Sequence, residues 1–202
     1  MARKKSERKA KTFSEAIGIN YIINDKTGFF LGLILLFFSV FVILALISYF
    51  STGQADQSLV ESLRPGEMEN STHEFQNSCG SVGAIISYYL ISRCFGIPAF
   101  FVPVFVILCG LKLMGVYKNI SLWKWFFGTM LVMIWSSVFF AKFFTPIMGD
   151  QVFNPGGDHG EYVCQWLQNV IGEPGLVAIL LVVALGFLTY LTSDHHRDTQ
   201  DA

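Results

Sequence analysis

The chain has 202 residues, of which 52% are hydrophobic and only 14% are charged, and its mean hydropathy is +0.50. A soluble domain carries about 25% charged residues, so this composition excludes an ordinary soluble protein and favours a chain embedded in lipid. The net charge of −1 hides an uneven distribution, because half of the basic residues precede residue 27 and acidic residues dominate two later segments.

The N-terminal part divides into a basic head, residues 1–26, and an apolar stretch, residues 28–50. Basic tails can bind nucleic acid or anionic lipid, but they are first of all the topological signal of a cytoplasmic segment. The apolar stretch carries no charge and is long enough to cross about 30 Å of hydrocarbon. No small-residue cleavage site follows it, so we expect an uncleaved first span and not a signal peptide.

Residues 51–76 are polar and acidic, which predicts an external loop before a surface helix at 81–95. Gly80 and Gly83 open this helix, and Gly96 closes it near where a left-handed C-cap would lie. Its apolar residues follow the i, i+3, i+4, i+7, i+8 spacing of an amphipathic helix: Val82, Ile85, Ile86, Tyr89 and Leu90. Such a stripe suits a helix lying at the membrane interface.

Two further spans follow, at about 97–116 and 126–144, separated by a short central loop. Pro98 and Pro103 fall near the start of the second span, where missing N–H donors are tolerated. Basic and aromatic residues mark the loop and its interface, namely Lys112, Lys118, Lys124, Trp123 and Trp125. Lys142 near the end of the third span can extend toward the headgroups.

The rest of the chain repeats the order of the first half. An acidic segment, 146–173, contains the turn Asn154-Pro155-Gly156-Gly157 and then Gly160 before a second surface helix. The apolar residues of that helix have the same spacing: Val163, Trp166, Leu167, Val170 and Ile171. Gly172 and Pro174 form an elbow, and residues 175–192 make the fourth span before a hydrophilic segment, 194–202.

Charge sets the orientation. The head and the central loop hold ten of the fourteen Lys and Arg residues, whereas nine acidic residues lie in the two long loops. The positive-inside rule therefore places both termini in the cytoplasm and the acidic loops outside. We expect an all-α integral membrane fold with four transmembrane helices, two external amphipathic interfacial helices and a parallel internal repeat.

Sequence signals for chemistry are sparse. There is no GxxxxGK[ST] phosphate loop, GxSxG, HExxH or EF-hand loop, so we expect no enzyme activity and no cofactor. The predicted spans contain almost no ionisable side chains, which argues against a transporter or channel. His195 and His196 could bind a metal, but a solvated tail is the simpler interpretation.

The external residues leave two questions open. Cys79, Cys94 and Cys164 fall on the oxidising side, where a disulfide can form, whereas Cys109 lies in a span. The surface helices carry aromatic residues that are either interface anchors or a partner-docking face: Tyr88, Tyr89, Tyr162 and Trp166.

One set of residues resembles a known family. Asn77-x-x-Gly80-x-x-Gly83-Ala84, then Phe95-Gly96-x-x-Ala99-Phe100 and Pro103, is similar to the signature of the N-terminal four-span membrane domain of FtsK/SpoIIIE DNA translocases. The resemblance covers residues 27–193. It identifies these positions as structural motif residues, to which Gly160, Gly172 and Gly175 of the second half are added.

The resemblance implies a chain anchored in the bacterial inner membrane at the division septum. It also implies a linker and a hexameric ATPase that moves double-stranded DNA in chromosome segregation, neither of which we can place on these 202 residues. The expected partners are the lipid bilayer, further copies of the chain and membrane proteins of the division machinery, with DNA contacted only through a motor domain. The alternatives are a four-span scaffold without a motor and a small transporter or channel component.

Overall fold

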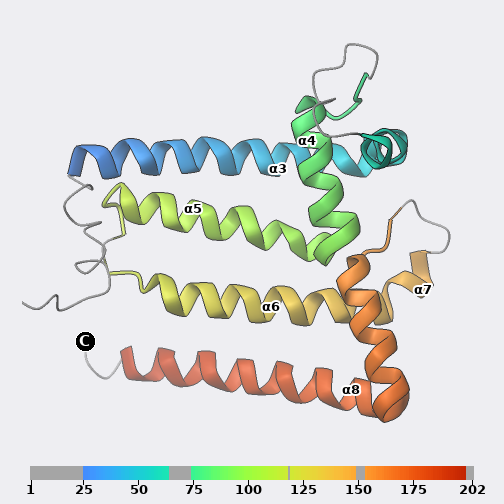
Figure 1. The fold of residues 1–202 in the computed structure, drawn as a ribbon. Coiled ribbons are helices and arrows are strands. Elements are labelled where there is room, and N and C mark those ends of the chain that lie inside the picture. Colours follow the sequence, from blue (N-terminus) through green and yellow to red (C-terminus); the bar gives the residue numbers. More distant parts are fainter. Residues whose placement is uncertain (1–24, 64–73, 118, 149–152, 199–202) are drawn as a thin grey trace, which may run out of the picture.

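The computed structural model describes residues 25–63, 74–117, 119–148 and 153–198, and these residues form helices and turns without a strand. Four long helices lie side by side in the order α3 (Asp25–Ser62), α5 (Phe101–Leu113), α6 (Leu122–Phe143) and α8 (Gly157–Asp198) (Figure 1). The start of α3, the end of α8 and the α5–α6 connection share one end of this layer (Figure 1). The expected all-helical architecture is confirmed.

Three of the helical segments are long and apolar enough to cross a membrane, namely 26–62, 122–147 and 157–190. The predicted second span is shorter than expected: its apolar helical stretch is 97–113, beginning with a 3₁₀ turn, η3 (Ile97–Phe100), before α5. The predicted third span starts four residues early, at Leu122. A single turn, α7 (Thr145–Met148), follows it.

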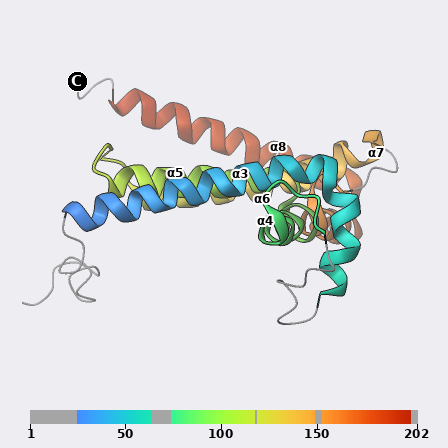
Figure 2. The same ribbon diagram turned by 90° about the horizontal axis from the view of Figure 1, so that it is seen from above.

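The expectation of a loop at 51–76 is wrong for its first part, because α3 remains helical to Ser62. Residues 54–62 contain neither glycine nor proline, and Gln57 donates a hydrogen bond to Glu61 one helical turn later, at 3.1 Å. Figure 2 shows the last turns of α3 bending away from its long first part. The centre of the expected loop, 64–73, lies outside the described residues.

The first surface helix is not a regular α-helix. It begins as α4 (Gly80–Ser87) and continues as a π-helix, η2 (Tyr88–Phe95). A π-helix has i→i+5 hydrogen bonds. The apolar stripe drawn from the sequence is also not the face that the protein buries, and this difference already holds in the regular α4 part. Val82 and Tyr89 are half exposed. The side packed on the protein instead carries Gly83, Ala84, Ser87, Tyr88 and Ile91.

The second surface helix forms the first part of α8, which turns sharply at Gly172 (φ 74°, ψ 172°) into the long second part (Figure 1). The backbone remains helical through Asp198, so the hydrophilic segment expected from residue 194 begins as helix. The side chains of His195 and His196 lie outside the described set.

Two separate cores hold the molecule together, one in each half. In the first half (residues 25–117), α3, the surface helix and η3 bury Leu46, Tyr49, Ala84, Ile91 and Ala99. In the second half (residues 119–198), α6 and both parts of α8 bury a smaller set: Val138, Ala141, Cys164, Leu176 and Leu180.

Candidate functional site

The motif residue Asn77 fixes the start of the first surface helix. Its Oδ1 accepts the Cys79 N–H at 3.0 Å, and its carbonyl accepts the Gly80 N–H at 2.8 Å. Its buried Nδ2 donates to the Ala45 carbonyl at 3.0 Å and to Ser87 Oγ at 3.3 Å. One amide therefore joins the turn, α3 and α4, and an apolar side chain could make none of the three side-chain bonds.

Glycine is required at positions 80 and 83 of this turn for two different physical reasons. Gly80 has φ 65°, which favours glycine. Gly83 is needed for space, because a Cβ there would lie 2.3 Å from Cys79 Cβ and 2.7 Å from Asn77 Oδ1. Ala84 is 1% exposed and belongs to the first core.

The elbow at Gly96 is where the two halves meet. Gly96 has φ 71° and ψ −143°, a region open only to glycine, so the expected left-handed C-cap is wrong in its ψ angle. A Cβ at Gly96 would lie 2.0 Å from the Pro155 carbonyl oxygen, which also accepts the Ile97 N–H at 2.9 Å. Ala99 and Pro103 are buried just beyond the elbow.

The second half contains a turn with the same hydrogen bonds. Asn154 Oδ1 accepts the Gly156 N–H at 2.9 Å, and the Asn154 carbonyl accepts the Gly157 N–H at 2.9 Å. Gly157 has φ 66°, close to that of Gly80. At Gly160 a Cβ would lie 2.3 Å from the Ser137 carbonyl oxygen, so this glycine is required for close packing on α6.

Asn154 and Gly157 were missed as motif residues, although the sequence holds their signal. Asn77-x-x-Gly80-x-x-Gly83 and Asn154-x-x-Gly157-x-x-Gly160 have identical spacing, and both halves later read Gly-x-Pro followed by a small residue. That small residue is Ala99 or Gly175, and a Cβ on Gly175 would meet Ile171 at 2.9 Å. Gly172 is the elbow glycine of the second half.

The turn of the second half fits into the elbow of the first. A Cβ on Gly157 would lie 2.4 Å from the Cys94 carbonyl oxygen and 2.5 Å from the Gly96 nitrogen. Gly156 is equally confined, with a Cβ 2.4 Å from the Ser137 carbonyl oxygen. Ser137 Oγ donates to the Gly156 carbonyl at 2.6 Å. At Gly157 the two halves are therefore in direct backbone contact, which leaves no space for a Cβ.

A polar cluster crosses the same junction. Arg93 of η2 donates from Nη2 to Glu61 Oε1 and from Nη1 to Asp158 Oδ2, both at 3.2 Å. Its Nε donates to Tyr88 Oη at 2.7 Å, and Tyr88 Oη donates to Glu61 Oε1 at 2.6 Å. Arg93, Glu61 and Asp158 are about half exposed, so solvent screens both ion pairs and each contributes little to stability.

The cluster shifts the acidity of its members. Hydrogen bonds from Tyr88 and Gln57, with the nearby Arg93 charge, lower the pKa of Glu61 below its ordinary value. Burial, then the hydrogen bond to Glu61, raises the pKa of Tyr88 to about 12. The phenol therefore stays protonated and remains a donor at physiological pH.

Another carboxylate, Asp56, is 2% exposed near the end of α3. Its Oδ1 accepts the Gln76 N–H at 2.7 Å, which secures the return of the chain toward Asn77. Within the described part of the chain, Oδ2 has no hydrogen-bond partner. A single bond to the main chain gives Asp56 a structural role.

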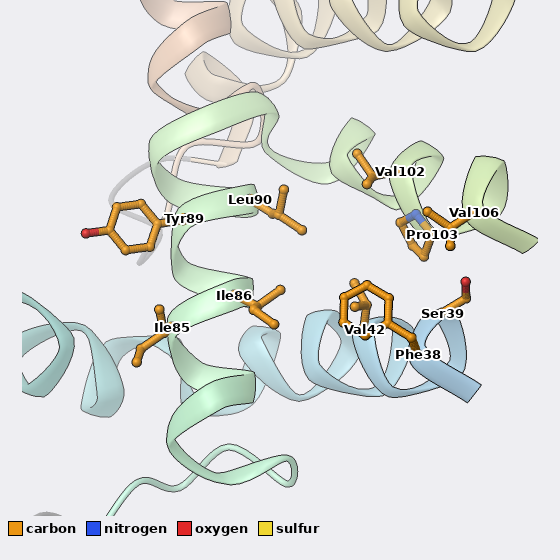
Figure 3. A pocket seen from close by; sticks show the side chains of 10 residues that line it. All are labelled: Phe38, Ser39, Val42, Ile85, Ile86, Tyr89, Leu90, Val102, Pro103 and Val106. Atoms are coloured by element: carbon orange, nitrogen blue, oxygen red, sulfur yellow. The ribbon is translucent and has the colours of Figure 1, made fainter. Parts of the chain in front are cut away.

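The apolar stripe expected on the first surface helix faces a cavity of about 330 Å³ between this helix, α3 and α5. Figure 3 shows Ile86 and Leu90 pointing toward Phe38, Val42 and Pro103, while the Tyr89 hydroxyl points away. Ile85, Ile86 and Leu90 of the stripe are partly buried and pack against the first core, at the edge of this cavity.

The structure also gives the partner of Lys142 and the state of the four cysteines. Lys142 Nζ donates to Glu173 Oε1 in the second elbow, so its charge is paired at the end of α6. The four cysteines are free thiols. In the described ranges, no group of three His, Cys, Asp or Glu side chains is placed to hold a metal ion.

The aromatic residues of the surface helices differ in exposure. Tyr88 is buried in the first core, whereas Tyr89, Tyr162 and Trp166 are more than half exposed. The last three are accessible to either a membrane interface or a partner. Together these features join the two helix pairs at one junction.

A family model described as the 4TM region of DNA translocase FtsK/SpoIIIE matches residues 29–196. No curated protein and no solved structure matches the chain. The matched range includes every helix described above except the first turn of α3 and the last residues of α8.

Proposed function

Because the chain belongs to the FtsK/SpoIIIE 4TM family, we propose that it anchors a DNA translocase in the bacterial inner membrane and assembles it at the division septum. The family match over residues 29–196 carries this proposal. The region is the non-motor, membrane part of such a translocase, and DNA is contacted only through a motor domain. Copies of the chain and division-machinery proteins are its proposed partners.

The membrane arrangement has four spans and is divided into a head at 1–26, a membrane domain at 27–193 and a linker from 194. Three long apolar helices and the shorter 97–113 stretch support this arrangement. At about 1.5 Å per residue, α5 alone would cover less than the roughly 30 Å of hydrocarbon. The surface helix that precedes it therefore lies partly within the interface.

The two halves form a parallel repeat with both termini in the cytoplasm. The matching turns at Asn77 and Asn154 and the positive φ angles at Gly96 and Gly172 support the repeat. Excess Lys and Arg in the head and central loop supports the orientation.

Accessibility in intact cells tests this arrangement. Single cysteines at Gln57 and Asn119, in a chain whose four native cysteines are replaced by serine or alanine, are treated with a membrane-impermeant thiol reagent. We expect labelling at position 57 and protection at position 119, with both labelled after permeabilisation. Labelling of position 119 alone in intact cells would contradict the orientation.

Assembly and recruitment need a separate measurement. Fluorescently tagged chain should gather at mid-cell, and detergent-solubilised chain should give oligomers by mass photometry. A chain that is monomeric and evenly spread in the membrane would contradict the assembly role and leave only anchoring.

A further inference from the structure

An apolar cleft of about 610 Å³ separates α6 from the second part of α8. Its walls are Phe127, Gly128, Leu131, Val183, Gly186 and Phe187. A second cavity of about 260 Å³ shares Leu131, Val183 and Phe187 with it and continues inward to Trp135. There the cleft ends, because Trp135 Nε1 donates to the Leu180 carbonyl at 2.9 Å.

The first half shows that a helix pair of this kind can close. On α3 and α5, a Cβ at Gly32 would lie 2.5 Å from the Gly110 carbonyl oxygen, so the two backbones touch. On α6 and α8, a Cβ at Gly128 or Gly186 would meet nothing within 4 Å. Gly110 and Gly186 each lie fourteen residues after their elbow glycine, so the same position is packed in one half and open in the other. Figure 2 shows the end of α8 diverging from the other helices.

The mouth of the cleft differs from its walls. Trp123, Lys124 and Tyr190 lie there, near the end of the layer that holds the central loop. Tryptophan and tyrosine favour the membrane–water interface, and a lysine at that level attracts anionic lipid headgroups. The cleft thus has an aromatic and cationic entrance and an apolar interior.

We propose that this cleft binds one anionic phospholipid, with an acyl chain between Gly128 and Gly186 and its phosphate at Lys124. The inference rests on the membrane placement of α6 and α8 proposed above. A transmembrane helix is about 10 Å wide, so roughly 8 Å of its length would fill a space of 610 Å³. A hydrocarbon chain is narrower and can follow the cleft inward to Trp135.

Native mass spectrometry of the purified full chain tests the site, with phosphatidylglycerol or phosphatidylcholine added as the probe. Wild type should retain one phosphatidylglycerol in preference to phosphatidylcholine. The double variant Gly128→Leu/Gly186→Leu fills the cleft and should lose at least about tenfold in lipid affinity. Lys124→Gln should lower the preference for phosphatidylglycerol about fivefold while acyl-chain binding persists.

Val182→Leu is the matched control, because Val182 is an exposed residue of α8 outside the cleft lining. It should retain lipid as wild type does. Equal lipid retention in the double variant overturns the site. A double variant that instead loses self-association at unchanged lipid retention assigns the cleft to a second copy and also overturns it.

Carbonate extraction of membranes distinguishes a failure of the lipid site from a failure of the proposed membrane placement. Protein that resists extraction but shows no cleft-dependent lipid overturns the lipid site alone. Protein released by carbonate overturns the membrane placement and the lipid site with it.

Discussion

The two halves use the same turn and elbow but pack their helices differently. Asn77 and Asn154 begin equivalent turns, and Gly96 and Gly172 both adopt positive φ angles. Gly96 lies sixteen residues after Gly80, whereas Gly172 lies fifteen after Gly157. The first surface helix accommodates the extra residue by forming a π-helix, whereas the second surface helix lacks that residue and remains an α-helix. A one-residue difference is thus absorbed within the helix while both elbows keep their place.

The long helices of the two halves pack differently at two positions along their length, and the pair that is closed at one position is open at the other. Gly32 and Gly110 let α3 and α5 touch, while Gly128 and Gly186 face the cleft between α6 and α8. Closer to the surface helices, the first half has the cavity of Figure 3, at Ser39. At the corresponding position of α6, 96 residues later, Trp135 fills the space and bonds to α8. Equivalent turns therefore position both pairs, and side-chain volume decides where each pair opens.

The elbows should show the largest effect. At Gly96→Ala the new Cβ would lie 2.0 Å from the Pro155 carbonyl oxygen, in a backbone region that only glycine enters readily. We expect a loss of about 4 kcal/mol or more in the free energy of unfolding. Gly172→Ala meets only Pro174 Cδ at 3.7 Å and should lose about 1–3 kcal/mol from backbone strain alone. Denaturation of both variants in mild detergent, followed by circular dichroism, measures the difference; equal losses would contradict the interlocked junction.

The helix-pair glycines should rank next. Gly32→Ala pushes α3 from α5 and should destabilise the chain by about 2 kcal/mol. At Gly128 and Gly186 a new Cβ has free space, and alanine favours the helix more than glycine does. Gly128→Ala and Gly186→Ala should therefore each be neutral or stabilising by up to about 1 kcal/mol. The same denaturation assay applies. A destabilising Gly128→Ala would mean that the α6–α8 cleft is closed in solution.

The turn asparagines provide a finer test. Asn77→Ala removes a buried amide that donates to α3 and α4, and should cost about 2 kcal/mol. Asn154 bonds to Thr145 Oγ1 and to the exposed Glu161 carboxylate, so Asn154→Ala should cost about half as much. Asn77→Asp keeps the Oδ acceptor but sets a buried carboxylate oxygen against the Ala45 carbonyl, so it should lose more stability than Asn77→Ala. If both alanine variants lose equal stability, burial is not what separates the turns.

The sequence predicted the helical class, the apolar segments and both elbows, since these depend on composition, glycine and the hydrophobic period. It did not predict the π-helix, because the stripe at Val82 to Leu90 fits a 3.6-residue period and only packing distinguishes the i→i+5 form. The polar junction was also missed. Arg93 and Glu61 are thirty-two residues apart, and their contact depends on α3 remaining helical to Ser62. Asn154, by contrast, was available from spacing alone.

Deleting one residue from the π-helix tests how the halves differ in length. Removing the exposed Tyr89 makes the distance from glycine to elbow fifteen residues, as in the second half. The buried Ile91 then follows the buried Ser87 by three positions, a spacing that keeps both on one face of an α-helix. We expect retention of the fold, with a stability change below about 1 kcal/mol, because π segments are strained relative to α-helix. A deletion that prevents membrane insertion or unfolds the chain would show that the π-helix itself is required. Deletion of Tyr162, in the regular second surface helix, is the control and should destabilise the fold far more.

Acid should produce the smallest effect, and in both halves. The pKa of Glu61 is lowered by hydrogen bonds from Tyr88 and Gln57 and by Arg93, and that of Glu173 by Lys142. Because each folded-state pKa lies below the unfolded value, the stability these carboxylates contribute is complete above pH of about 4.5 and is lost as the pH falls through the folded pKa. The melting temperature of wild type should therefore be insensitive to these groups between about pH 7 and 5 and should fall below that range.

Glu61→Gln and Glu173→Gln should each melt slightly lower at neutral pH and lose part of the acid response. Both carboxylates are exposed, so the changes should be small. An undiminished acid response in Glu61→Gln would mean that the Arg93 cluster does not join the two halves in solution.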